Sequence, residues 1–529
     1  MKSIRRLALS SAAGILAMGG AQAADLPVKA KAVEYVRICS LYGAGFYYIP
    51  GTDTCIKLGG YLRVDVLANS NIDDTGNTFG AGGAQNRFTN GLSLLSREDL
   101  SIDTRTATEY GLVRTLTFLT FTWRTDTFAG VGNGATVYSL NPGTTNGSAV
   151  NNANTGAVAG GYVGVYAAFI QFAGFTIGKA ISQFSAPFQN YPGNIFDGLV
   201  GGGGAITAVN QFTYTAEFGG GWSGKISLQE QTAYYQAGVV NLGARNANGS
   251  ATGALGPFGA SDYAGTVAPD IVGVLKLDQA WGSLQGSIAA HDNHAAYYGG
   301  TELTGHPDDR WGWAGQLAAS IKTPMTGTGD VLNIQGVYTD GATRYNIQDL
   351  AAQAGANTIY GSTGQAGAYQ SIGLGIASDT VFAVGTQQQL LQTWGMRGGY
   401  THNWDPHWNS SIYGAYAAIT YNDTAKVLMC GVNGVGGSIR SANPVAAGIP
   451  LTAITTCNPD YNIAQLGFVT RWTPVKNLSF TADVTLTHLD QKMVGTVIAP
   501  STSVGKPVAA YELKDQNTAL LLIRAQRNW

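Results

Sequence analysis

The chain has 529 residues, of which 73 are Gly and only 12% are charged, while 45% are hydrophobic. Soluble domains carry about 25% charged residues and roughly 7% Gly, so this composition does not fit an ordinary soluble surface. A mean hydropathy of +0.02 argues against a bundle of transmembrane helices. The 30 Lys and Arg against 32 Asp and Glu give no basic excess for nucleic-acid binding. Abundant Gly, many aromatic residues and few charges indicate an all-β protein with one face toward an apolar medium.

A basic start, a short apolar run and a small-x-small site open the sequence. Three basic residues in the first six positions precede the apolar run Leu7–Met18, which is followed by Ala21-Gln22-Ala23. This order is typical of a secretory signal peptide, and the run is too short for a membrane anchor of about 20 residues. We therefore expect residues 1–23 to be a signal peptide and the mature chain to be exported.

Apolar and polar residues alternate with a period of two in many later runs. In Ile56–Val66 the even positions are apolar or Gly, and the odd positions include Lys, Arg and Asp. In Leu478–Thr487 the two classes alternate without exception. A β-strand places such sets on opposite faces. Each apolar face is about five residues long, which predicts strands of roughly 9–11 residues, the length that crosses an outer membrane when tilted.

Short turns and long connections alternate between the predicted strands. The seven short turns are 106–110, 173–174, 218–222, 278–281, 323–329, 404–407 and 473–477. The eight long connections are 70–94, 125–160, 185–208, 234–269, 293–309, 341–391, 422–461 and 491–514. Seven and eight make 15 connections, which predicts sixteen strands. Short turns at one rim and long loops at the other are typical of an outer-membrane β-barrel, whereas a β-sandwich has no reason to keep the two lengths in register.

The last strand is expected over Thr518–Trp529. Leu521, Ile523 and Trp529 fall on one face of this strand, and Arg524 falls on the other. We expect the apolar row to face lipid, and an aromatic final residue on that face is typical of outer-membrane insertion signals.

Four cysteines form two local pairs in the sequence, Cys39 with Cys55 and Cys430 with Cys457. An even count in an exported chain predicts two disulfides. Three connectivities are open, and we favour the two local ones because each closes a Gly-rich loop. The spacings match no zinc site, so no metal is expected.

The motifs of common enzymes are missing from the sequence. No GxSxG marks a nucleophile, and Gly201–Gly204 is not followed by the Lys-Ser/Thr of a phosphate loop. We interpret His291, His294 and His306 as solvated histidines of one loop rather than metal ligands. We therefore expect neither catalysis nor a cofactor.

The segment around the first two cysteines carries a family resemblance. Tyr35–Cys55, with the sequence YVRICSLYGAGFYYIPGTDTC, resembles the N-terminal signature of the alphaproteobacterial porins of the rhizobial and Brucella type. Leu58–Asp65 resembles the first strand of that family, and Asp103–Gly111 and Ala173–Lys179 resemble its early hairpins. The resemblance runs in strand order over essentially the whole mature chain.

This resemblance implies a 16-stranded antiparallel transmembrane β-barrel with short periplasmic turns, long external loops and a third loop folded into the lumen. It also implies a location in the Gram-negative outer membrane, contact with the lipid bilayer and lipopolysaccharide, and a homotrimer that passively conducts ions and small hydrophilic solutes. Residues 24–54 would form a periplasmic, plug-side segment with the Cys39–Cys55 loop, and residues 55–529 the barrel. Two alternatives stay open, a channel selective for a sugar or an organic acid, and a surface β-rich adhesin.

Charged residues of the early strands are expected to face the pore. In a barrel of this size the inward side chains are polar and enclose a water-filled channel. The third long connection, 185–208, has one charged residue, Asp197. We hypothesise that Arg63, Arg105 and Arg114 face Asp197 across a constriction, where opposed charges set the ion preference.

An alternative for these arginines is that they only pair across strands with carboxylates of the same face, Asp65, Asp99 and Asp103. Three arginines beside several acids leave the sign of the ion preference open.

Overall fold

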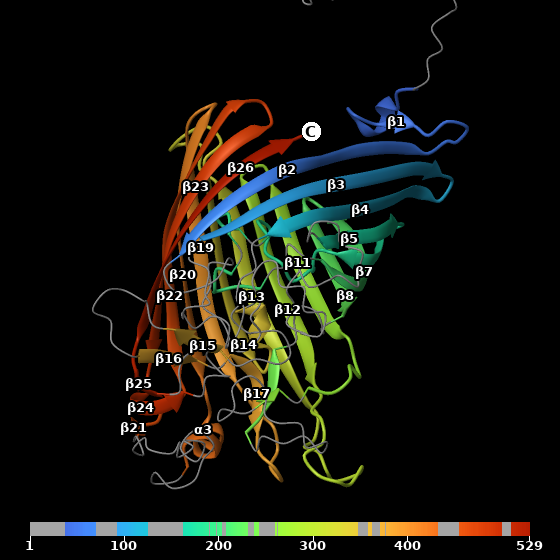
Figure 1. Ribbon diagram of the computed structural model, residues 1–529. Coiled ribbons are helices and arrows are strands. Elements are labelled where there is room, and N and C mark those ends of the chain that lie inside the picture. Colours follow the sequence, from blue (N-terminus) through green and yellow to red (C-terminus); the bar gives the residue numbers. More distant parts are fainter. Residues whose placement is uncertain are drawn as a thin grey trace, which may run out of the picture.

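The computed structural model describes residues 37–69, 92–124, 162–189, 191–196, 198–203, 208–230, 237–242, 260–261, 263–347, 358–361, 371–375, 377–431, 454–499 and 509–529. Its main sheet has 17 strands. One of them, the two-residue β1 (Tyr47–Tyr48), pairs only with β2, and the other sixteen close into a barrel (Figure 1). The predicted strand number and antiparallel architecture are confirmed. The expected signal peptide lies outside the described residues.

The barrel strands follow one another around the wall in chain order. They are β2 (Cys55–Asn69), β3 (Leu92–Thr108), β4 (Gly111–Arg124), β5 (Tyr162–Phe172), β6 (Phe175–Ala180), β7 (Val209–Gly219), β8 (Trp222–Gln229), β11 (Asp270–Gln279), β12 (Gly282–Asn293), β13 (Arg310–Lys322), β14 (Val331–Asp340), β19 (Gln392–Asp405), β20 (Trp408–Thr420), β22 (Tyr461–Val475), β23 (Leu478–Gln491) and β26 (Gln516–Asn528).

The first and last barrel strands close the ring. β26 pairs antiparallel with β2 from Tyr61, opposite Asn528, to Asn69. Beyond β26, the Trp529 backbone N–H donates to the Gly60 carbonyl at 3.1 Å. A Cβ at Gly60 would overlap the carbonyl oxygen of Asp99, so the close approach of β2 and β3 here requires Gly.

Alternation along the strands separates an apolar outside from a polar inside. On β2 the outward Leu62 and Val64 are exposed, whereas the inward Asp65 is buried. On β26 the outward Leu521 and Ile523 are exposed, as the sequence predicts. Exposed tryptophans lie beside the short turns at one rim, namely Trp222, Trp281, Trp404, Trp408 and Trp472. Such a ring is the aromatic girdle of a membrane barrel.

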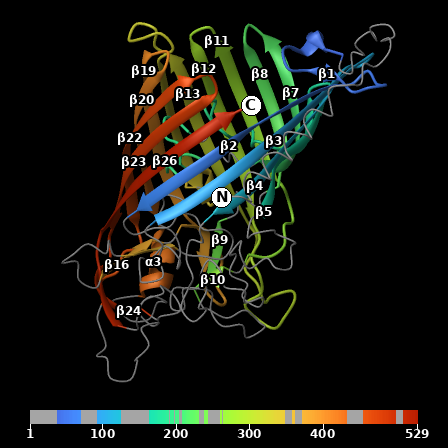
Figure 2. The same cartoon turned by 45° about the horizontal axis from the view of Figure 1, so that its top comes forward.

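The two rims differ in the way the sequence predicts. Each of the seven short turns joins two neighbouring strands at one rim, and the strand ends that the eight long connections join lie at the other rim (Figure 2). Among the described parts of these connections are α3 (Asp423–Cys430), η5 (Thr343–Tyr345) and two small sheets. One small sheet contains β9 (Gly238–Asn241), β10 (Ala260–Ser261), β17 (Ser378–Phe382) and β18 (Gln389–Leu390). The other contains β15 (Thr358–Gly361), β16 (Ser371–Gly375), β21 (Ile454–Thr456), β24 (Val494–Ala499) and β25 (Ala509–Leu513).

Two disulfides cross-link the irregular segments, one to the start of β2 and the other within the external connection between β20 and β22. Cys39 is bonded to Cys55 at the start of β2, and Cys430 at the end of α3 is bonded to Cys457. These are the two local pairs favoured from the sequence. The first disulfide packs with Phe46 beside the short 3-10 helix η1 (Ser40–Tyr42). Among the described residues, no helix is both long and apolar enough to span a bilayer.

Candidate functional site

The third long connection enters the barrel directly after β6. Phe184, Phe196 and Leu199 of this segment are buried inside the wall, so the predicted inward loop is present. We call the described residues 181–203 of this connection the inward loop. A polar backbone inside a barrel needs hydrogen-bond partners, because an unpaired buried N–H or C=O is costly.

Polar side chains of the barrel wall supply those partners. Gln316 Nε2 and Gln285 Nε2 each donate at 2.8 Å, to the carbonyl oxygens of Phe184 and Ser185. Further along the loop, the backbone N–H of Ile195 donates to Asp483 Oδ2 at 2.8 Å. Three more wall residues on β14, β19 and β22 bond the loop backbone, Asn333, Arg397 and Gln465. The inward loop is therefore held against the wall formed by β12 to β23.

A second segment inside the barrel, at η5 in the connection after β14, is hydrogen-bonded to the end of the inward loop. The Gly202 backbone N–H donates to the Asn346 carbonyl at 2.9 Å, beside η5. The rings of Phe184 and Tyr345 meet edge to face with centroids 4.6 Å apart. Gly201 has a φ of 85°, and a Cβ there would overlap the backbone of Met396. Only Gly fits this close passage of loop over wall.

His291 anchors the same region, and its interpretation as a solvated loop histidine is wrong. It lies on β12, is fully buried, and its Nδ1 is 2.8 Å from Asp270 Oδ1. Its Nε2 is 3.4 Å from Asp379 Oδ2. Asp379 also accepts from the backbone N–H groups of Ala237 and Thr343, at 2.7 and 2.6 Å. One buried carboxylate thus ties two external connections to the barrel. Within the described residues, no cluster of His, Cys, Asp and Glu could hold a metal ion.

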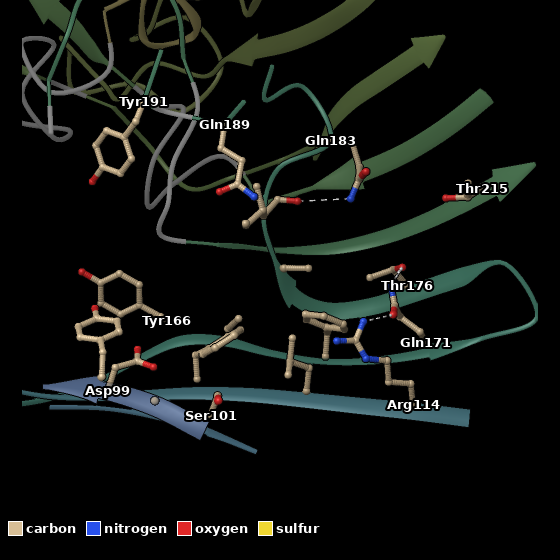
Figure 3. Close-up of a pocket in the computed structure, with 18 of the residues that line it drawn as sticks. Asp99, Ser101, Arg114, Tyr166, Gln171, Thr176, Gln183, Gln189, Tyr191 and Thr215 are labelled. Carbon is tan, nitrogen blue, oxygen red and sulfur yellow. Dashed lines mark hydrogen bonds between the residues drawn. The ribbon is translucent and has the colours of Figure 1, made fainter. Parts of the chain in front are cut away.

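The inward loop leaves an open cavity of about 1210 Å³ along the opposite wall. Figure 3 shows Gln189 and Tyr191 of the loop on one side of this cavity, with Tyr166, Asp99 and Arg114 on the other. Ten charged residues line it, six basic and four acidic: Arg63, Arg97, Arg114, Lys225, Lys276 and Arg524, and Asp65, Asp99, Glu217 and Asp278. The charges of this lining sum to +2.

The residues predicted for a constriction occupy different places. Arg63 and Arg114 line the cavity, and Arg105 is not among its lining residues. Arg105 and Arg114 both pair with Asp103 at 3.0 Å; the Arg114 pair runs between β4 and β3, as in the cross-strand alternative, whereas Arg105 is on the same strand as Asp103. The Arg105 guanidinium also lies over the Phe46 ring, 4.7 Å from its centroid. Asp197 lies outside the described residues.

Several lining residues escaped the sequence analysis. Arg97 has the same strand parity as Asp99 and Asp103, so the alternation could have identified it. Lys225 and Lys276, on β8 and β11, belong to the part of the wall where no charge was singled out. The bonds between wall and inward loop had no signal in the sequence.

Comparisons with known proteins agree with this architecture. A family model described as Porin subfamily matches residues 25–522. The chain is 32% identical over 291 residues to porin Omp2b of Brucella suis and to porin Omp2b of Brucella melitensis. Each alignment spans 54% of this chain and 66% of the relative, just under two thirds of its length. Among solved structures, the outer membrane channel DcaP of Acinetobacter baumannii superposes with a TM-score of 0.51 and 15% identity, over 91% of this chain and 99% of that one. At that identity, the likeness concerns the fold alone.

Proposed function

Because the chain belongs to the porin subfamily of outer-membrane β-barrels, we propose that it is a passive diffusion channel for ions and small hydrophilic solutes. One observation carries this proposal. A cavity of about 1210 Å³, lined by ten charged side chains, stays open between the inward loop and the wall. A barrel that is apolar outside and charged inside gives polar solutes a route through a bilayer.

The alternatives receive less support. A surface adhesin would have no use for an inward loop bonded by side chains of six strands beside an open, charged lumen. Membership of the porin subfamily implies a channel rather than an enzyme. A channel selective for a solute class is compatible with the same cavity and is treated below.

Assembly and constriction complete the proposal. The resemblance to trimeric porins supports a homotrimer surrounded by lipid and lipopolysaccharide. Arg63 and Arg114 would act on passing ions, because both line the cavity. Arg105 would act through Asp103, whose charge it shares with Arg114. The opposing charge of Asp197 stays a prediction.

Single-channel recording tests the proposal. Detergent-purified protein, shown to be folded by its heat-modifiable migration, is added to a planar bilayer in KCl. Stepwise current increases are expected, and liposomes containing the protein should swell in neutral sugars at rates that fall with sugar size. Boiled protein is the matched control. Folded protein that gives neither current steps nor swelling would overturn the proposal.

A further inference from the structure

Two arginines stand directly opposite each other on the wall of the cavity. Arg63 on β2 pairs in register with Arg97 on β3, and both side chains line the lumen. Like charges placed directly opposite destabilise a strand pair. This arrangement therefore lowers the stability of the barrel, and a role in the lumen would account for it.

Neutral groups hold the two guanidinium groups in place. Arg63 Nε donates to Gln526 Oε1 at 2.9 Å, and its guanidinium lies 4.5 Å from the centroid of the Tyr61 ring. Arg97 donates to Thr122 Oγ1 at 2.9 Å and to the Tyr166 hydroxyl at 3.0 Å. These contacts fix the positions of the two guanidinium groups.

The carboxylates nearest to Arg63 do not engage the terminal N–H donors of its guanidinium group. Both oxygens of Asp65 are engaged by Arg524, at 2.7 and 2.8 Å. Among the described residues, no carboxylate lies within 4.0 Å of the Arg63 guanidinium, and only its Nε makes a hydrogen bond. Asp99, opposite Tyr61 in the register, is the next carboxylate along the wall. The two terminal Nη groups of Arg63 thus form a fixed fork of N–H donors.

Leucines line the cavity on the external side of this pair. Leu67 and Leu522 are opposite each other in the register of β2 and β26, and Leu95 precedes Arg97 by two residues on the same face of β3. A solute that enters from the loop side passes these apolar side chains before it reaches the arginines.

We propose that Arg63 and Arg97 form a binding site in the lumen for small organic carboxylates with an apolar body. The guanidinium fork of Arg63 matches the two oxygens of a carboxylate, a bidentate geometry that a Lys cannot reproduce. The leucines contact the apolar body, and Arg97 supplies a second positive charge. This inference rests on the proposed channel function and adds a solute class to it.

Block of the KCl current by benzoate tests the site. Benzoate is expected to reduce the current of reconstituted wild-type channels at lower concentrations than acetate, which has the carboxylate but hardly any apolar body. The variant Arg63→Gln should raise the half-blocking benzoate concentration about tenfold, the loss expected for a charge-assisted hydrogen bond. Arg63→Lys should weaken the block nearly as much, because it keeps the charge and loses the fork.

Lys225→Gln is the matched control, since it removes one positive charge from the same cavity on β8, six strands further around the wall than β2. It should change the half-blocking concentration by less than about twofold, as expected for a distant screened charge. Heat-modifiable migration and the KCl conductance report whether each variant is folded. If Arg63→Gln fails to assemble, Arg97→Lys tests the site from the facing strand.

The possible results separate the two proposals. Folded wild-type protein without current steps in KCl would refute the channel function and this site with it. A conducting channel that benzoate blocks equally in wild type and Arg63→Gln would refute the site alone. Equal effects of Arg63→Gln and Lys225→Gln, or a block by acetate or inorganic phosphate as strong as that by benzoate, would also overturn it. A wild-type block by benzoate that Arg63→Gln weakens and Lys225→Gln leaves intact would support the site.

Discussion

Asp103 forms ion pairs with two arginines of the early strands, Arg105 and Arg114. Arg105 and Arg114 are directly opposite on β3 and β4, an arrangement that is destabilising by itself. Asp103 lies between them and pairs with both at 3.0 Å. The three side chains are partly buried, which strengthens the pairing relative to surface ion pairs. This cluster carries a net charge of +1 beside the cavity.

Replacing Asp103 by Asn should shift the ion preference toward anions. The substitution removes the carboxylate partner of Arg105 and Arg114, and Arg114 lines the cavity. A unit charge about 5 Å from an ion in water contributes about 0.8 kcal/mol, so the Cl⁻/K⁺ permeability ratio should rise roughly two- to fivefold. The reversal potential across a KCl gradient measures this ratio. Asp423→Asn, in the external helix α3, is the control; an Asp103→Asn channel with the wild-type ratio would contradict the prediction.

Asp330 is a buried carboxylate in a periplasmic turn, just before β14. Its oxygens lie 2.9 Å from the Asn403 backbone N–H, 2.7 Å from the Tyr400 hydroxyl and 2.7 Å from His402 Nδ1. Burial by itself raises the pKa of Asp330, but the hydrogen bonds from Asn403, Tyr400 and His402 outweigh it and hold the pKa well below its ordinary value. The turn between β13 and β14 is thereby fixed to the end of β19.

The Asp330→Asn variant should unfold at a temperature several degrees below that of the wild type. A carboxylate whose pKa is lowered by folding contributes stability above its unfolded pKa, and that stability is lost only as the pH falls through the lower folded pKa. The difference between variant and wild type should therefore persist from about pH 7 to about pH 4 and shrink only in stronger acid. Heat-modifiable migration against temperature at each pH measures it. A difference that already vanishes near pH 5 would contradict the assignment.

At the scale of elements, the inward loop depends on bonds to the wall rather than on its own secondary structure. Asp483 on β23 is the clearest anchor. It is fully buried, accepts from the Ile195 backbone N–H at 2.8 Å, and accepts from the Tyr413 hydroxyl at 2.5 Å. The Phe196 ring packs beside Tyr413, with centroids 6.1 Å apart. Loss of this anchor would leave the buried Ile195 N–H without its partner, at about 1–3 kcal/mol, whereas the Tyr413 hydroxyl would keep Thr485 as a partner.

The variant Asp483→Ala should loosen the inward loop without opening the barrel. We expect noisier single-channel currents with frequent sublevels, and faster protease cleavage within the loop. Thr481→Ala is the matched control, because Thr481 faces the lumen from the same strand two residues earlier. Quiet currents and protease resistance equal to those of Thr481→Ala would show that Asp483 does not hold the loop.

The strands were predictable because their signal is local. Alternation in Leu478–Thr487 reflects the two solvents on either side of the wall, and connection length reflects which rim a turn occupies. The alternation is weak in β4 (Gly111–Arg124), and the structure shows why. Its inward row includes Leu116 and Phe118, which line the cavity, so both faces are apolar and the period weakens.

The site was only partly predictable because its contacts are remote in sequence. Arg63 and Arg114 could be placed on the lumenal face by parity alone. Nothing in the sequence distinguishes Asp483, which binds the loop 288 residues away, from other inward polar residues. His291 lies near the end of a strand, and its buried partner Asp379 belongs to a distant connection, so local composition pointed to a solvated loop.

For the whole molecule, the apolar outer surface decides where the protein is stable. Leu466, Phe468 and Val484 are about half exposed on neighbouring strands β22 and β23, a pattern that is unfavourable in water and favourable in hydrocarbon. The Trp408, Trp472 and Phe480 rings contact one another at the periplasmic rim, with centroids 6.4 and 5.7 Å apart. The belt of aliphatic side chains and its aromatic border define the depth of the barrel in the bilayer.

The cost of a charge on this surface should depend on depth. Leu466 lies near the middle of β22, so Leu466→Arg should destabilise the barrel by about 2–4 kcal/mol and reduce the heat-modifiable form in outer membranes. Val475, at the periplasmic end of the same strand and equally exposed, is the matched site, where Val475→Arg should cost about 0–1 kcal/mol. Unfolding in denaturant from lipid vesicles measures both. Because a water-exposed surface would tolerate Arg equally at the two positions, equal stabilities would refute a membrane-spanning wall with this depth.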